Sequence, residues 1–138
     1  MRHARRIVAA AAMLALVVGA LAGCATPAVD RGGCVPRFSI EPGVARVGDS
    51  LEFSSRDVCA VDVPRTGWRV AILVPGSAEA RATVRSTETF DGSWTVRIVV
   101  PPGVPAGQAS VTITNWDYSS CPDGASCAGP SAEFTVER

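Results

Sequence analysis

From residue 37 onward, apolar and polar residues alternate in short segments that are separated by Gly, Pro, Asp and Ser. Apolar side chains at every second position place one face of an extended strand against a core and leave the other face in water. The residues between the segments are those that turns prefer. The pattern therefore predicts strands along this whole region and almost no helix.

The alternation predicts about seven strands in roughly a hundred residues, which is typical of an immunoglobulin-sized sandwich. A parallel sheet would need helices to connect its strands, so we expect an antiparallel β-sandwich. Trp68 and Trp94 each begin an inward-facing series and are expected in the core. The apolar residues of the strands are, in chain order, Phe38 and Ile40; Leu51 and Phe53; Trp68, Val70 and Ile72; Ala82 and Val84; Trp94, Val96, Ile98 and Val100; Val111 and Ile113; Phe134 and Val136.

Two segments rich in proline and glycine indicate how the strands connect. Pro42-Gly43 and Gly48-Asp49 enclose the short piece Val44–Val47, so the first strand is expected to break there and switch sheets. Further along, Pro101–Gly107 contains three prolines, which cannot donate ladder hydrogen bonds. We expect that segment to connect opposite sheets.

These turn signals resemble those of bacterial immunoglobulin-like surface modules. Such modules open on a V-x-P-G-x-x-x-x-G-D pattern and close on V-P-x-x-x-x-x-G-x-x-x-V-x-I. The corresponding stretches are Ile40–Asp49, with isoleucine in the first position, and Val100–Ile113. The resemblance extends over most of residues 36–136. It implies an immunoglobulin-like fold and a role as a spacer, adhesion or accessory domain.

The first 24 residues resemble a bacterial lipoprotein signal. Three arginines precede Ile7–Ala22, an uncharged run of 16 residues that stops just before Cys24 in Leu-Ala-Gly-Cys. A permanent membrane span needs roughly 20 apolar residues, so this run is too short. The resemblance implies removal of residues 1–23 and a diacylglycerol thioether on Cys24. Ordinary secretory cleavage after Ala20-Leu21-Ala22, which would release a soluble protein, is the alternative.

Loss of the first 23 of 138 residues would leave 115, enough for one domain with its own core. We expect residues 24–33 to form a lipidated linker that spans at most about 30 Å. Residues 34–138 are expected to form the sandwich domain. The lipid would hold the protein on the extracytoplasmic face of the cell membrane.

Charge and missing residue types exclude several functions. All 13 Lys and Arg residues are arginine, and three of them lie in the signal. The remainder therefore contains ten arginines and 13 acidic residues. No basic cluster is left there to bind nucleic acid. The only histidine is His3, and no lysine could serve as a base. The acidic residues are scattered, with no pair that marks a glycosidase. We therefore expect no catalytic residues, no metal site and no cofactor.

With Cys24 lipidated, four cysteines remain: Cys34, Cys59, Cys121 and Cys127. An even number in an exported domain favours two disulfides, for which three pairings exist. In an immunoglobulin-like strand order, all four would gather at one end of the sandwich. We prefer Cys34–Cys59 and Cys121–Cys127, because the second pair closes a loop whose Pro-Asp-Gly suits a turn. A metal site is the alternative, disfavoured by the absence of C-x-x-C spacing.

The best candidate for recognition is Asn115-Trp116-Asp117-Tyr118, above all Trp116, Asp117 and Tyr118, where the sixth expected strand enters the longest loop. Aromatic side chains on a loop that a disulfide holds in place supply contact area at low entropic cost. In the alternative interpretation, Trp116 covers the core and Tyr118 packs on the disulfide. Asp117 and Asp123 are candidate calcium ligands, but they lack the oxygen-rich spacing of calcium loops.

Two functions fit these features. We favour a non-enzymatic envelope lipoprotein whose domain binds a protein or glycan partner through the loops that carry the cysteines. The alternative is a structural or accessory subunit of a membrane-bound complex, which would make contact through strand faces or an uncovered edge strand. An exposed aromatic patch at Trp116 and Tyr118 would favour the first function, and an apolar stripe along an edge strand the second.

Overall fold

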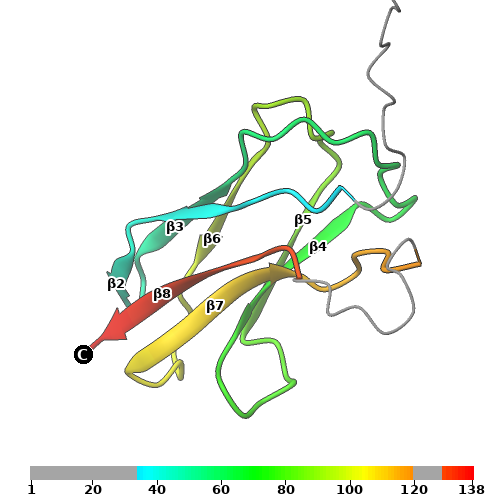
Figure 1. Ribbon diagram of the computed structural model, residues 1–138. Coiled ribbons are helices and arrows are strands. Elements are labelled where there is room, and N and C mark those ends of the chain that lie inside the picture. Colours follow the sequence, from blue (N-terminus) through cyan, green and yellow to red (C-terminus); the bar gives the residue numbers. More distant parts are fainter. Residues whose placement is uncertain (1–33, 120–128) are drawn as a thin grey trace, which may run out of the picture. The chain divides into compact units, whose positions relative to one another are not determined.

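The computed structural model describes residues 34–119 and 129–138, which form two β-sheets packed against each other (Figure 1). One sheet has the strand order β1-β3-β6 and the other β2-β8-β7-β4-β5. The predicted all-β class is confirmed. In these residues, no helix is long and apolar enough to cross a membrane. The strands are β1 Ser39–Glu41, β2 Val44–Arg46, β3 Ser50–Ser54, β4 Trp68–Leu73, β5 Ala82–Ser86, β6 Thr95–Val99, β7 Gly107–Ile113 and β8 Ser131–Glu137.

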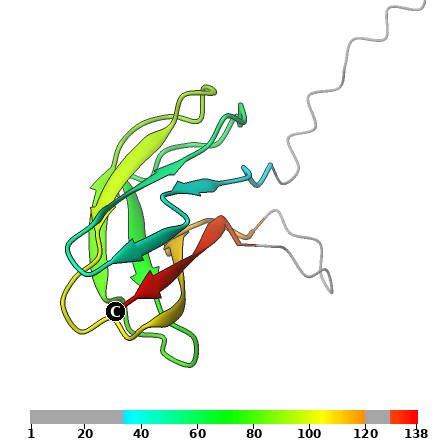
Figure 2. The same cartoon turned by 90° about the vertical axis from the view of Figure 1, so that its left-hand side faces the viewer.

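The first expected strand is divided between the two sheets, as Pro42-Gly43 and Gly48-Asp49 predicted. β1 pairs with β3, whereas β2 pairs with β8, the red arrow that ends at the C-terminus in Figure 2. The division gives eight strands where about seven were expected. The prediction of a wholly antiparallel sandwich is wrong for one pair, because β2 and β8 run parallel. The chain changes sheets without reversing its direction, and Thr135 N donates to Gly43 O at 3.0 Å.

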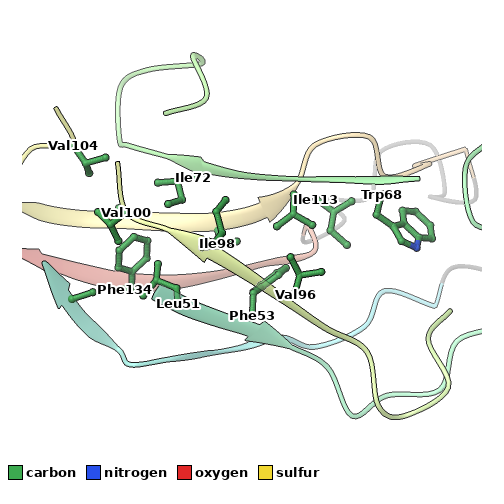
Figure 3. Packing of buried hydrophobic residues seen from close by; sticks show 14 of the residues in the cluster. Leu51, Phe53, Trp68, Ile72, Val96, Ile98, Val100, Val104, Ile113 and Phe134 are labelled. Atoms are coloured by element: carbon green, nitrogen blue, oxygen red, sulfur yellow. The ribbon is translucent and has the colours of Figure 1, made fainter. Parts of the chain in front are cut away.

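The apolar faces of the two sheets meet in a continuous core (Figure 3). β6 shows the expected alternation: Val96 and Ile98 are buried, while Thr95, Arg97 and Val99 are exposed. Every second side chain of this strand therefore points into the core between the two sheets. In central strand β4, three consecutive residues are buried, Val70, Ala71 and Ile72. The small side chain of Ala71 lies between Thr83 and Thr112 on the neighbouring strands.

One end of the core is built from six aromatic side chains, here called the aromatic cluster. Trp68 and Trp94 are both buried, as predicted. Phe90 joins them, with ring centroids 5.4 Å from Trp68 and 5.2 Å from Trp94. Offset-stacked and edge-on pairs add about 0.5–1.5 kcal/mol each beyond their buried area. The members are Phe38, Phe53, Trp68, Phe90, Trp94 and Trp116.

The proline-rich segment Pro101–Gly107 connects β6 to β7, and these two strands lie in different sheets. This confirms the predicted crossing. Val104 is buried and anchors the middle of the segment in the core. The crossing therefore combines prolines that cannot join a ladder with one apolar residue that fixes its path.

Gly67, directly before β4, is a position that only glycine suits. Its φ is +75°, and a Cβ there would meet Ser86 O at 2.8 Å. We predict that Gly67→Ala lowers the free energy of unfolding by about 2–4 kcal/mol, because left-handed backbone strain and a backbone clash combine. The measurement is urea denaturation of the disulfide-intact protein.

Gly76→Ala is the matched control, since Gly76 has φ +77° and a Cβ there would have no other atom within 4 Å. We expect a loss of about 1 kcal/mol there, from backbone strain alone. Equal losses for the two variants would show that the close approach of Gly67 to Ser86 contributes nothing.

Candidate functional site

The candidate residues lie at one end of the sandwich, here called the cysteine pole: Cys34 and residues 55–67, 87–94 and 115–119. A disulfide joins Cys34 to Cys59, with a Cα–Cα distance of 5.8 Å, which confirms the preferred pairing for these two cysteines. Cys59 N also donates to Phe90 O at 2.9 Å. The bridge thus ties the start of the domain to two loops. The other predicted cysteine sites, Cys24 and the Cys121–Cys127 bridge, lie outside the described residues.

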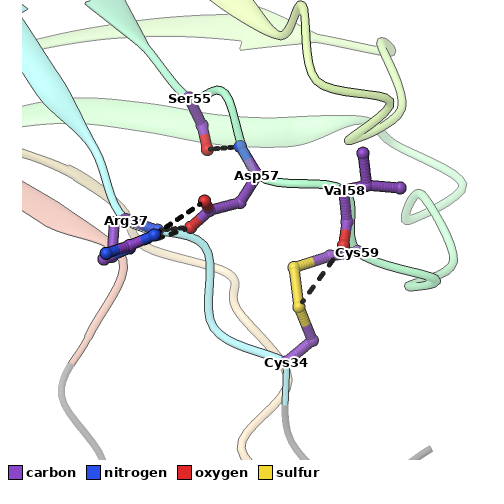
Figure 4. A network of polar contacts seen from close by, with 6 residues as sticks. All are labelled: Cys34, Arg37, Ser55, Asp57, Val58 and Cys59. Carbon is purple, nitrogen blue, oxygen red and sulfur yellow. Dashed lines mark hydrogen bonds and ion pairs between the residues drawn. A yellow bond between two sulfur atoms is a disulfide. The ribbon is translucent and has the colours of Figure 1, made fainter. Parts of the chain in front are cut away.

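Asp57 reinforces the same connection (Figure 4). Arg37 N donates to Asp57 Oδ2 at 2.7 Å, and the Arg37 guanidinium contacts both carboxylate oxygens at 3.4 Å. The backbone hydrogen bond from Arg37, followed by its side-chain bond, lowers the pKa of Asp57. Cys34 Sγ lies 3.9 Å from Val58 O, a van der Waals contact because an oxidised sulfur has no proton to donate. The role of Asp57 is structural.

Asn115 fixes the point at which β7 passes into the candidate loop. Its Oδ1 accepts from Arg69 N at 2.7 Å, and its Nδ2 donates to Gly67 O at 2.9 Å. One side chain thereby satisfies both backbone groups at the start of β4. The polar part of this side chain is occupied by the backbone, so Asn115 positions its neighbours.

Trp116 is half-buried and belongs to the aromatic cluster. Its ring stacks on Trp68 with centroids 5.2 Å apart and planes 22° apart, and it meets Phe90 nearly edge-on at 5.8 Å. Trp116 therefore covers one end of the core, as the alternative interpretation held. Its position is fixed by that packing while part of the ring remains accessible.

Asp117 and Tyr118 are both exposed. Asp117 Oδ1 accepts from Ser119 N at 2.8 Å, and hydrogen bonds from Ser119 lower the pKa of Asp117, so its carboxylate is charged at neutral pH. Tyr118 is 45% exposed. Its hydroxyl oxygen would lie 2.9 Å from a Cβ at Gly129, so Tyr118 packs near the point where the described chain resumes. Asp123, the other candidate calcium ligand, lies outside the described residues.

A pocket of about 190 Å³ lies between residues 61–64 and residues 115–119. Trp68 and Trp116 contribute aromatic surface to it. Val61 and Pro64 add aliphatic surface, and the carboxylates of Asp62 and Asp117 supply charge. Asn115, Trp116 and Asp117 belong to the segment that was predicted from the sequence, whereas Val61, Asp62 and Pro64 were missed. No sequence motif links these residues, because they come from two segments about fifty residues apart that only the fold brings together.

The pocket can bind through aromatic faces and anionic oxygens. In residues 34–119 and 129–138, no three His, Cys, Asp or Glu side chains are grouped to hold a metal ion. No model of a known protein family and no curated protein matches this chain. We therefore infer its function from the chemistry of the cysteine pole.

The disulfide is expected to stabilise the domain. We predict that Cys34→Ala/Cys59→Ala lowers the free energy of unfolding by about 3 kcal/mol, since the bridge closes a loop with a sequence separation of 25. Urea denaturation measures the loss. Cys121→Ala/Cys127→Ala is the control, with an expected loss of about 2 kcal/mol from a shorter loop. An unreduced peptide joining Cys34 to Cys121 or Cys127 would contradict the pairing.

Asn115→Ala is expected to cost about 1–3 kcal/mol, because it leaves the Arg69 N–H and the Gly67 carbonyl without their side-chain partner. Tryptophan fluorescence should shift to the red as Trp116 loosens. Asn115→Asp keeps the acceptor for Arg69 but turns a carboxylate oxygen toward the Gly67 carbonyl in place of the donor, so it should also be less stable than the wild type. Wild-type stability in the alanine variant would refute the positioning role of Asn115.

Proposed function

We propose that this protein is a non-enzymatic, lipid-anchored envelope protein whose immunoglobulin-like domain binds a protein or glycan partner through the cysteine pole. The observation that carries the proposal is the pocket at this pole, with the indole of Trp116 in its wall and the exposed ring of Tyr118 nearby. Aromatic anchors beside polar groups are typical of recognition surfaces.

The strand order supports the immunoglobulin-like assignment. In that fold, one sheet contains the first, second, fourth and fifth strands, and the other contains the third, sixth and seventh. With β3 as the second strand, β4 as the third and β6 as the fifth, the two sheets follow this division. The difference is β5, which pairs with β4 at the edge of the second sheet. Trp68, buried at the start of β4, occupies the place of the third-strand tryptophan.

The Cys34–Cys59 bridge supports an extracytoplasmic location, because disulfides persist in oxidising compartments. With a lipid on Cys24, the linker of residues 24–33 would reach the domain at the cysteine pole. The linker spans at most about 30 Å. The proposed anchor therefore keeps the pole near the membrane, and the partner is a component that is accessible at the membrane surface.

The residue types at the pole support a binding role. Beyond the expected signal the chain contains no histidine and no lysine. A nucleophile activated by either base is then excluded. Its carboxylates, aromatic rings and amides are groups that recognise a ligand through shape and charge.

A structural or accessory role is the second candidate. Three exposed valines favour it, Val44, Val47 and Val99, with exposed fractions between 47% and 53%. Val44 lies on β2 and Val99 on β6, which are edge strands of different sheets. Edge strands with apolar side chains are a route to pairing with another chain.

Capture of partners from detergent-solubilised envelope separates the two roles. We expect Trp116→Ala/Tyr118→Ala to lose the co-purifying partner by at least tenfold. The control Val44→Ser/Val47→Ser should retain it. Quantitative mass spectrometry measures the partner, and circular dichroism establishes that both variants are folded. Loss in the valine variant alone would favour the accessory role.

Cys24→Ser tests the anchor in the same preparation. Without the thioether, the protein should leave the membrane fraction while its domain keeps the same partner in solution. An unmodified Cys24 in the wild-type protein, found by mass spectrometry, would refute lipid anchoring. It would leave the proposed binding role of the cysteine pole untouched.

A further inference from the structure

The pocket at the cysteine pole carries charge of one sign only. Its two ionisable side chains are the carboxylates of Asp62 and Asp117, and no arginine lines it. In the described parts of the chain there are three ion pairs, Arg37–Asp57, Arg46–Glu137 and Arg97–Glu52. Neither pocket carboxylate takes part in them. Residues 120–128, which lie outside the described residues, contain no basic residue either.

Beside these carboxylates lies the stacked pair of Trp68 and Trp116. The Trp68 indole N–H is already used, because it donates to Glu88 O at 3.0 Å. Trp68 is only 3% exposed and Trp116 covers one face of its ring, so the accessible aromatic face of the pair is that of Trp116. Cations are attracted to the faces of such rings, most strongly to tryptophan. The aromatic surface and the two negative charges both favour a cationic ligand.

The hydrogen-bonding groups also distinguish a cation from a sugar. Both charged groups of the pocket can only accept hydrogen bonds, and Asn115 uses its Oδ1 for Arg69 N and one of its two N–H groups for Gly67 O. The Ser119 hydroxyl hydrogen-bonds to Asp117, so the donors that remain on the lining side chains are the second Asn115 N–H and the Trp116 indole. A sugar hydroxyl needs donors as well as acceptors, whereas a guanidinium group only donates. The balance favours a ligand that donates.

The size of the pocket limits the ligand further. Pockets for small molecules usually measure about 300–1,000 Å³, and this one measures about 190 Å³. It suits one long side chain better than an oligosaccharide. Val61 and Pro64 supply aliphatic surface against which the methylene part of such a side chain can pack.

We propose that the pocket binds an arginine side chain of the protein partner, with the guanidinium group between the two carboxylates and the indole surface. Arginine fits better than lysine because its planar group stacks on aromatic rings and is weakly hydrated. The proposal rests on the proposed function, since it names the chemistry by which the same pole recognises its partner. It selects a protein partner over a glycan.

The test titrates the complete processed chain in non-ionic detergent with Nα-acetyl-arginine methylamide. The tryptophan indole signals are followed by ¹⁵N NMR. We expect the Trp68 and Trp116 signals to shift and saturate, with weaker binding at high salt. The citrulline analogue, which has the same shape and no charge, should bind at least tenfold more weakly. Equal binding of citrulline, saturation by glucose instead, or no shift of either indole would overturn the proposal.

Asp62→Asn and Asp117→Asn should each weaken arginine binding several-fold. Glu79→Gln, at an exposed carboxylate in the loop between β4 and β5, should leave it unchanged. Partner capture separates this inference from the proposed function. If Asp62→Asn/Asp117→Asn retains a partner that Trp116→Ala/Tyr118→Ala loses, the arginine site is refuted and the binding role stands. If both retain it, the binding role fails as well.

Discussion

Contact among the six rings of the aromatic cluster is the interaction on which the rest of this structure depends. Phe53 belongs to β3 and Trp68 to β4, so the cluster joins the two sheets. Phe90 and Trp116 come from irregular segments and pack 5.8 Å apart in the same cluster. The described loop residues at this end therefore have defined positions without regular hydrogen-bonded ladders. The Cys34–Cys59 bridge and the Arg37–Asp57 pair hold the start of the domain on this packed base.

Much of the fold could be predicted because a sandwich repeats one simple rule. Each strand must place alternate side chains in a shared core, and that rule leaves a visible period in the sequence. The division of the first strand was predictable for a similar reason, since Pro42-Gly43 interrupts the ladder locally. The parallel pairing of β2 with β8 was not, because it depends on where the chain lies after it changes sheets. Strand direction within a pair is set by such long-range geometry and leaves no local pattern.

The site was less predictable than the fold. Trp116 and Asp117 stood out because an aromatic and an acidic residue follow a clear strand. Asp62 and Pro64 gave no such signal, since a loop with mixed composition shows neither a period nor a motif. The clamp made by Asn115 was also hidden, because an asparagine after a strand is common and its two partners are 46 and 48 residues away. Irregular segments become a site only when the fold has placed them together.

The acidic residues of the cysteine pole have two different roles. Asp57 is held by Arg37, and the fold accounts for it fully. Asp62 and Asp117 have no such ion pair among the described residues, and a chain with more acids than arginines outside its signal has many exposed carboxylates. Charge alone therefore does not mark a site. Their place beside stacked indoles does, because there the carboxylates can act on a ligand without first breaking an ion pair of the fold. Under the proposed arginine site, recognition can change at Asp62 and Asp117 while the aromatic cluster keeps the domain folded.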